Sequence, residues 1–248
     1  MFYSESKNSW PFLKGPAFRM QANSINLAYL SSDPSDQGLN ELKGRFSLYL
    51  TDSGFIRNWI FENIDCCIMV MTTPDLNKFQ LKLSKNKVHY VYIQHSLASL
   101  HMIYRPGAFD HFDTIFCAGP HHVKEVRALE KLSNSAPKAI IEHGYPITDE
   151  FLTVKPYKTE WEICPSYSKA NVLIAPSWGP EGLIETGLAA DIINLLLVEQ
   201  FKVVLRPHPE TMKQFEVEVT KIINRYEGNE HFTLERDCTD WMSFKESD

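Results

Sequence analysis

The sequence predicts an α/β protein built from two Rossmann-like domains with mostly parallel sheets. Short apolar runs alternate with stretches of helical spacing throughout the 248 residues, which is the pattern of parallel strands joined by helices. This length allows one large domain or two small ones, each with its own core. The composition, with 44% hydrophobic and 12% aromatic residues, is that of an ordinary globular protein.

Seven apolar runs in the first part are expected to form strands. They are Phe2–Ser4, Asn26–Leu30, Phe46–Leu50, Cys66–Met71, Val88–Gln94, Thr114–Ala118 and Ala139–Glu142. Between them, Ser53–Asn63 and Pro120–Leu132 have helical spacing, and Gly119 before Pro120 suits the start of a helix. The segment Asn8–Ala22 contains two prolines and a glycine that interrupt any helix there.

The periodicity lapses between Leu152 and Ser168, which predicts an interdomain connection. We therefore expect an N-terminal domain at residues 1–158 and a C-terminal domain at residues 169–248. The elements expected in the second domain are strand Asn171–Pro176, helix Leu183–Gln200, strand Lys202–Arg206, helix Glu210–Tyr226 and strand His231–Glu235. Nucleotide-binding domains usually carry about five or six strands. Three strands therefore predict a truncated second domain, either a fragment or a naturally shortened form.

The charge balance argues against a nucleic-acid partner. The net charge is -6, from 25 Lys and Arg against 31 Asp and Glu, and we see no basic stripe of the kind that nucleic-acid binders usually carry. An anionic substrate is still compatible with this charge, because a few cations focused in a cleft can outweigh a mildly acidic exterior.

We see neither a signal peptide nor an apolar segment long enough to span a bilayer. We expect a cytoplasmic protein, with any membrane association peripheral, on the inner face of the cell membrane. The five cysteines have no metal-ligand spacing, and Cys66, Cys67 and Cys117 lie in apolar runs, so we expect buried free thiols. We expect no metal and no other cofactor.

Two basic side chains follow the apolar run Val203–Leu205. Arg206 and His208 each precede a proline, and we expect them at the carboxyl edge of a sheet, where open α/β folds bind ligands. The planar guanidinium matches phosphate oxygens, and the prolines reduce the backbone freedom that is lost on binding. The pattern favours a phosphate site. The alternative is that Arg206 only caps the strand and His208 packs against it.

The most apolar strand of the first part ends in Gln94-His95-Ser96. A histidine at the carboxyl end of a parallel strand faces the crevice, and its near-neutral pKa suits it to take a proton from an alcohol. The alternative is a core histidine bonded to a backbone carbonyl. His101, further along the loop, is a weaker candidate for the same role.

A third strand end, Ala175-Pro176-Ser177-Trp178-Gly179, leads into a turn before a predicted helix. Backbone N–H groups at such a helix start, together with the Ser177 hydroxyl, could hold a phosphate oxygen. Alternatively, the glycines only serve the turn, because the spacing is not that of a P-loop.

Two other segments with histidines are assigned no chemistry. Glu142–Asp149 is interpreted as a structural corner with Gly144 and Pro146 in a turn. His121 and His122, at the start of a predicted helix, are expected to face solvent.

Read together, these strand ends resemble the CDP-glycerol glycerophosphotransferase family, the teichoic-acid polymerases and primases of the GT-B group. The matches, in chain order, are His95-Ser96-Leu97 for a His-Gly-Thr-like turn, Gly144, Pro146 and Asp149 for a Gly-x-Pro-x-x-Asp motif, Ala175-Pro176-Ser177-Trp178 for Ala-Pro-Thr/Ser-Trp, and Arg206 with His208 for an Arg-x-His strand end. They cover nearly the whole chain. Position 96 is Ser where the family usually has Gly. The family's Asp-x-x-Ser turn, which helps to hold the donor diphosphate, would begin where this sequence ends, so we expect an incomplete donor site.

The resemblance implies a GT-B architecture with the active site in the interdomain cleft. His95 would act as the base on an acceptor hydroxyl, while Arg206 and His208 would stabilise the donor phosphates as CMP leaves. The further substrate-binding residues would be Ser96, Ser177, Trp178 and Gly179. The implied reaction moves glycerol phosphate, or a related polyol phosphate, from a CDP-linked or other nucleotide-activated donor. Its acceptor would be lipid-linked or a cell-surface polymer, as in teichoic-acid or capsule biosynthesis.

Three alternatives stay open. A nucleotide-sugar glycosyltransferase for surface polysaccharide would use the same cations on a diphosphate. A non-catalytic fragment that binds nucleotide would explain an incomplete donor site. An epimerase acting on a UDP-sugar is disfavoured, because we see no second set of carboxylate and histidine side chains that would suit it.

Overall fold

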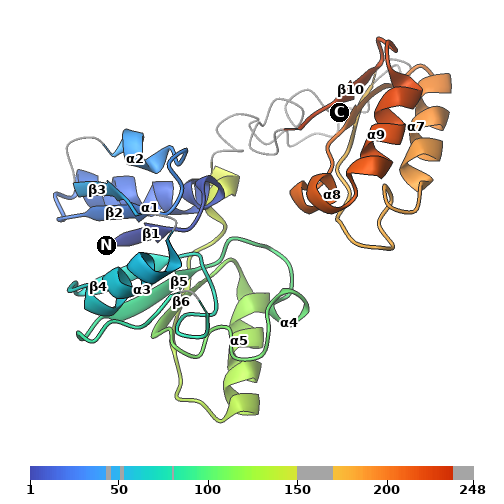
Figure 1. Ribbon diagram of the computed structural model, residues 1–248. Helices are drawn as coiled ribbons and strands as arrows, with labels where there is room; N and C mark the ends of the chain where they lie inside the picture. Colours follow the sequence, from blue (N-terminus) through green and yellow to red (C-terminus); the bar gives the residue numbers. More distant parts are fainter. Residues whose placement is uncertain (43–45, 51–52, 80, 150–169, 237–248) are drawn as a thin grey trace. The chain divides into compact units, whose positions relative to one another are not determined.

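A computed structural model describes residues 1–42, 46–50, 53–79, 81–149 and 170–236 (Figure 1). The chain divides into two compact units, Met1–Glu150 and Phe151–Asp248. Each unit contains a parallel β-sheet, which confirms the α/β class. The expected connection at Leu152–Ser168, the boundaries chosen at residues 158 and 169, and two of the cysteines, Cys164 and Cys238, lie outside the described residues.

All seven strands expected in the first part are present. They are β1 (Phe2–Ser4), β2 (Ala28–Ser31), β3 (Phe46–Tyr49), β4 (Ile68–Met71), β5 (His89–Ile93), β6 (Thr114–Cys117) and β7 (Ala139–Glu142). The helices of this unit are η1 (Lys7–Ser9), α1 (Trp10–Ala22), α2 (Gly38–Glu41), α3 (Gly54–Asn63), α4 (Leu100–Ile103) and α5 (Pro120–Ser133). The strand order is β3-β2-β1-β4-β5-β6-β7, and every pair is parallel.

Helices cover both faces of the seven-stranded sheet (Figure 1). On β5, Val91 and Ile93 pack in the cluster that contains the buried face of α1, while Tyr90 and Tyr92 pack in the cluster that contains residues of α3 and α5. Because successive side chains of a strand point to opposite faces, one apolar strand can support both layers. Because all seven strands are parallel, their carboxyl ends meet at one edge of the sheet.

The expectation for Asn8–Ala22 is wrong, because α1 runs without a break through its second proline. Pro11 lies in the first turn, where its missing N–H has no partner to lose, and only Pro16 is interior. An interior proline costs about 3 kcal/mol. Burial of Trp10 and Leu13, at 2% and 0% exposure, contributes about 1.5–3 kcal/mol each and outweighs that cost.

Gly38 is a position where packing leaves no room for a side chain. A Cβ atom there would lie 2.5 Å from Tyr29 Cζ and 2.7 Å from Trp10 Cε3, and both rings are buried. We expect Gly38→Ala to lower the free energy of unfolding by about 1–3 kcal/mol, measured by urea denaturation. The control Gly15→Ala on α1 meets no atom within 4 Å and should be neutral or stabilising. Equal effects of the two substitutions would contradict this account.

The second unit has a three-stranded parallel sheet in the order β10-β9-β8. Its strands are β8 (Asn171–Ile174), β9 (Lys202–Leu205) and β10 (Phe232–Leu234), and its helices are α7 (Leu188–Val198), α8 (Pro209–Gln214) and α9 (Glu216–Tyr226). The single helices expected at Leu183–Gln200 and Glu210–Tyr226 need correction. The first begins later, after Gly187 with φ 85, outside helical geometry, and the second is divided at Phe215.

Two expectations about composition can be compared with the structure. Within the described ranges, no helix is both long and apolar enough to cross a membrane. Cys117 is buried as expected, but Cys66 is half-buried and Cys67 is exposed. The expectation that all three thiols are buried is therefore wrong. Both follow α3 and precede the first residue of β4, and a position just outside a strand is not covered by the layers that pack on the sheet.

Candidate functional site

His95 lies two residues beyond β5, at the carboxyl edge of the first sheet. Its half-buried ring is surrounded by aromatic rings, with centroids 6.0 Å from Phe12, 6.2 Å from Tyr92 and 6.1 Å from Tyr104. The Tyr92 hydroxyl lies 3.1 Å from His95 Nδ1 and donates to the Tyr104 hydroxyl at 3.0 Å. These contacts hold the imidazole in one orientation.

Burial lowers the pKa of the His95 imidazole, and a hydrogen bond with the backbone of Thr72 acts in the opposite direction. The ordinary value is about 6.5, so the ring is neutral at pH 7 and can accept a proton. The backbone contact is also what a core histidine would make. His95 is only partly buried and lies beyond the strand, at the sheet edge, which favours the functional interpretation.

The residues after His95 form a tight turn. Ser96 Oγ accepts a hydrogen bond from Ala98 N at 3.1 Å, so this serine shapes the backbone beside the histidine. The segment interpreted as a corner also reaches this place, since the Tyr145 hydroxyl donates to the His95 carbonyl at 3.4 Å and its ring packs 5.5 Å from Phe12. This long-range contact, between residues 50 positions apart, could not be predicted from the sequence.

Gln94, next to the candidate base, was not singled out from the sequence. It is 1% exposed, and neither polar atom of its side-chain amide has a hydrogen-bond partner within the described part of the chain. An orphaned buried amide is costly, and a role at a functional site is one explanation for such a group. Its signal in the sequence was a polar residue at the end of an apolar run.

The expectation for His122 is wrong, because its side chain is fully buried. His122 Nε2 lies 3.0 Å from the Ala98 carbonyl, and its Nδ1 accepts from Ala118 N at 3.4 Å. Glu125, one turn further along α5, accepts from Leu100 N at 2.6 Å and from the Ser99 hydroxyl. The start of α5 therefore braces the loop that carries His95. His121 is exposed, as expected.

In the second unit, the structure brings Trp178 and His208 together. Their rings are stacked, with centroids 6.0 Å apart and an interplanar angle of 26°. His208 is the N-cap of α8, and its Nδ1 accepts from Glu210 N at 3.1 Å. The pKa of His208 is lowered, mainly by burial, and the carboxylates of Glu210 and Glu185 act in the opposite direction. Trp178 is 46% exposed and offers a flat aromatic face beside the imidazole.

Arg206 follows β9 and is only 6% exposed. Its Nε donates to Glu235 Oε2 at 2.7 Å, and the two side chains are 7% and 14% exposed. Glu235 follows β10, so this ion pair joins two strand ends. The sequence placed Arg206 at the sheet edge but gave no indication of its acidic partner.

Ser177 and Gly179 flank Trp178 in the segment that follows β8. Ser177 is exposed, and Gly179 has φ 137, a conformation that favours glycine. The helix expected from Leu183 begins only at Leu188, so no helix start lies close to Ser177 to hold a phosphate oxygen as expected. In the intervening turn, Glu185 Oε1 accepts from Thr211 Oγ1 at 2.7 Å, and Glu185 Oε2 is buried without a hydrogen-bond partner in the described part.

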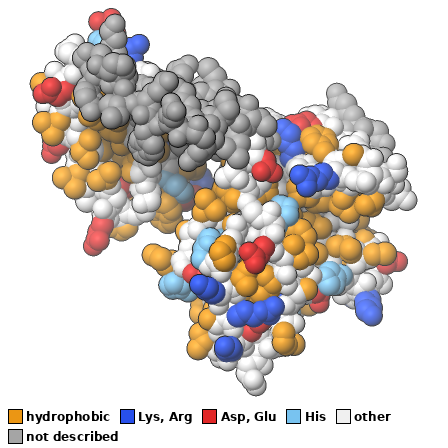
Figure 2. Space-filling model, turned by 180° about the vertical axis from the view of Figure 1, so that it is seen from behind, with side chains coloured by type: hydrophobic (Ala, Val, Ile, Leu, Met, Phe, Trp, Pro, Cys, Tyr) orange, Lys and Arg blue, Asp and Glu red, His pale blue; other side chains and the backbone are white. Residues whose placement is uncertain are grey.

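The predicted site residues thus form two groups, one in each unit. His95 and Ser96 lie at the edge of the first sheet, and the other five belong to the second unit. Among the residues described, no three His, Cys, Asp or Glu side chains are grouped as metal ligands. On the face drawn in Figure 2, basic, acidic and hydrophobic side chains are interspersed, without a continuous basic surface over the described residues.

Comparison with solved structures gives the fold. The chain is similar to the UDP-GlcNAc 2-epimerase from Methanocaldococcus jannaschii, with a TM-score of 0.52 and 11% sequence identity over 99% of this chain and 75% of that one. No family model and no curated protein matches the sequence significantly. The chain therefore has a GT-B-like α/β fold, as expected.

Proposed function

We propose that this protein is a transferase that moves glycerol phosphate, or a related polyol phosphate, from a CDP-linked donor to a lipid-linked or polymer acceptor of the cell surface. The observation that carries the proposal is His95, a neutral imidazole held by Tyr92 at the carboxyl edge of the first sheet. The GT-B-like fold supports it, and so do the family-like segments at both sheet edges.

In this reaction, His95 takes the proton from the acceptor hydroxyl as its oxygen forms a bond to the β-phosphorus of the donor. The bond between that phosphorus and the bridging oxygen breaks, and CMP leaves with the electron pair. Such a transfer needs mainly positioning and charge stabilisation. We assign donor binding to Arg206, His208, Ser177, Trp178 and Gly179, and acceptor binding to Ser96. Glu235 orients the Arg206 guanidinium through Nε.

The pH dependence of the rate follows from the direction of the His95 pKa shift. Only the neutral imidazole accepts a proton, and burial lowers its pKa. We expect kcat/KM to be level near pH 7 and to fall on acidification with a midpoint below about 6.5, the ordinary value for histidine. A pH profile of kcat/KM with CDP-glycerol measures this midpoint. An acid limb centred above the ordinary value would contradict a buried neutral base.

The test of the function is turnover of CDP-glycerol with a glycerol phosphate polymer as acceptor. CMP release and the mass of the extended acceptor are measured together, because CMP-sugar donors also release CMP. A parallel panel of UDP- and CMP-sugars covers the glycosyltransferase alternative. Turnover of a sugar donor without transfer from CDP-glycerol would replace the proposal, and donor binding without any transfer would favour a nucleotide-binding module.

A second candidate is an epimerase acting on a UDP-sugar. The sequence disfavoured this candidate because no second set of carboxylate and histidine side chains was seen. The structure provides such a set, since His208 lies within electrostatic range of Glu185 and Glu210. Incubation with UDP-N-acetylglucosamine and analysis of the sugar by NMR separates this candidate, because epimerisation releases no CMP.

A further inference from the structure

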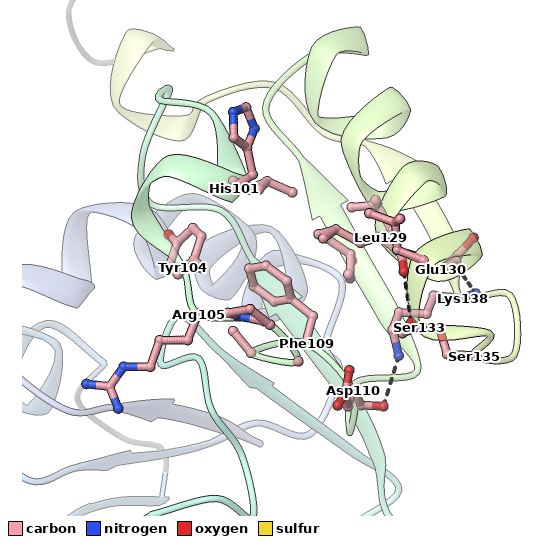
Figure 3. Close-up of a pocket in the computed structure, with 17 residues that line it drawn as sticks. His101, Tyr104, Arg105, Phe109, Asp110, Leu129, Glu130, Ser133, Ser135 and Lys138 are labelled. Atoms are coloured by element: carbon pink, nitrogen blue, oxygen red, sulfur yellow. Dashed lines mark hydrogen bonds between the residues drawn. The ribbon is translucent and has the colours of Figure 1, made fainter.

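The first unit contains a cavity of about 330 Å³ beside α5, and its lining includes exposed side chains such as His101 and Leu132 (Figure 3). Tyr104, which also lines it, contacts the His95 ring. Its apolar wall is made by Leu100, Tyr104, Phe109, Ile115, Val126 and Leu129. Protein cores are close-packed and have few voids larger than a water molecule. A volume in the range of about 300–1,000 Å³ is that of small-molecule pockets, so the cavity is large enough for a ligand.

The polar groups around the cavity are bonded to the protein. Lys138 Nζ donates to the carbonyls of Asp110 and Phe112 at 3.0 and 2.8 Å, and Ser133 Oγ donates to the Leu129 carbonyl at 2.8 Å. The Glu130 carboxylate accepts from Lys138 N at 2.7 Å. Figure 3 shows the Arg105 guanidinium directed away from the cavity. Because these polar groups already have partners in the protein, an occupant of the cavity would contact mainly the apolar side chains.

Helix α5 forms one side of the cavity. The lining residues on this helix run from Val126 to Ser133, which is about 10 Å at 1.5 Å per residue. The opposite side is formed by α4 and the loop that contains Ala108 and Phe109, and both of these loop residues are buried. An apolar lining that extends this far along a helix suits a hydrocarbon chain better than a polar molecule.

We propose that this cavity binds a hydrocarbon chain, either a straight alkyl chain or an isoprenoid. Burial of the chain against Phe109, Val126 and Leu129 supplies the affinity, since apolar contact area is the main favourable term for such a ligand. The proposal does not rest on the transfer reaction proposed above, although Tyr104 contacts both the cavity and the His95 ring. Its test can succeed or fail whatever the fate of that function.

The test is a fluorescence titration of the full chain with dansyl-labelled undecanoic acid, followed by displacement with n-decanol or geraniol. We expect saturable binding at one site. Displacement by n-decanol identifies an alkyl site, and displacement by geraniol an isoprenoid site. Leu129→Trp fills the cavity from α5 and should weaken binding by about tenfold or more, because a filled pocket excludes the chain.

The matched control is Leu195→Trp on α7, at a side chain that is 67% exposed, and binding should be unchanged. If Leu129→Trp fails to fold, Ala108→Leu fills the same space from the loop. Lack of saturable binding, lack of displacement by either alcohol, or equal binding by a folded cavity-filling variant and the control would overturn the proposal.

Discussion

Replacement of His95 by Ala should lower the turnover of CDP-glycerol by about 10²–10⁴-fold, the usual contribution of a general base. The variant removes the only group assigned to accept the acceptor proton, while the residues assigned to the donor lie in the other unit. We therefore expect kcat to fall and the dissociation constant for CDP-glycerol to stay the same. Steady-state kinetics and calorimetric titration measure the two quantities.

The matched control for this variant is His89→Ala, on the same strand. His89 begins β5, at the opposite edge of the sheet from His95, and its Nε2 contacts Thr114 Oγ1 at 2.8 Å. Its loss should leave turnover unchanged. If both variants are equally impaired, or if His95→Ala keeps full activity, His95 is a core histidine and the transfer needs another base.

The strands of this fold could be predicted because parallel strands are buried on both faces. Such strands are continuous apolar runs in the sequence, and the run around Val91 and Ile93 gave β5 to within about a residue at each end. The position of His95 beyond that strand then followed from topology, because the carboxyl ends of parallel strands share one edge. The proposal of chemistry at this edge rests on the same topology.

The helices were less predictable because tertiary packing overrides local signals. Pro16 predicts a break, yet burial of Leu13 and Ala17 holds α1 together. Local signals in turns were also missed. Gly187 has a left-handed conformation that delays the start of α7, and helical periodicity alone gives no sign of it.

The partners of the site residues could not be predicted, because they come from distant parts of the chain. His122 is buried by a contact with Ala98, 24 residues earlier, and Arg206 pairs with Glu235, 29 residues later. A single sequence indicates which residue types gather at a sheet edge. It does not indicate which of these charged side chains form ion pairs with one another. Because Arg206 is paired with Glu235, its role has to be tested together with that of its partner.

Arg206→Ala should lower the free energy of unfolding by about 3–5 kcal/mol, because it removes the guanidinium that is paired with the largely buried carboxylate of Glu235. The two side chains are 7% and 14% exposed, and their Nε to Oε2 distance is 2.7 Å. Urea denaturation measures this loss. A small change in stability would show that Glu235 finds another partner or solvent when the guanidinium is removed.

Loss of stability would obscure any role of Arg206 in donor binding, so the two effects must be separated. The double variant Arg206→Met with Glu235→Leu replaces both charges by apolar groups, and such replacements of buried pairs are often neutral or stabilising. A charge-assisted hydrogen bond to phosphate is worth about 1.5–3 kcal/mol. We therefore expect a stable double variant that binds CDP-glycerol about 10–100-fold more weakly.

Calorimetric titration of the double variant decides between the two interpretations of Arg206 that the sequence left open. Restored stability with weakened donor binding means that Glu235 orients a phosphate ligand. Restored stability with unchanged binding means that the guanidinium only ties β9 to β10. In that second outcome, the donor-binding candidates that remain at this edge would be the stacked Trp178 and His208 together with Ser177 and Gly179. The donor would then meet no permanent cation among the residues assigned to it.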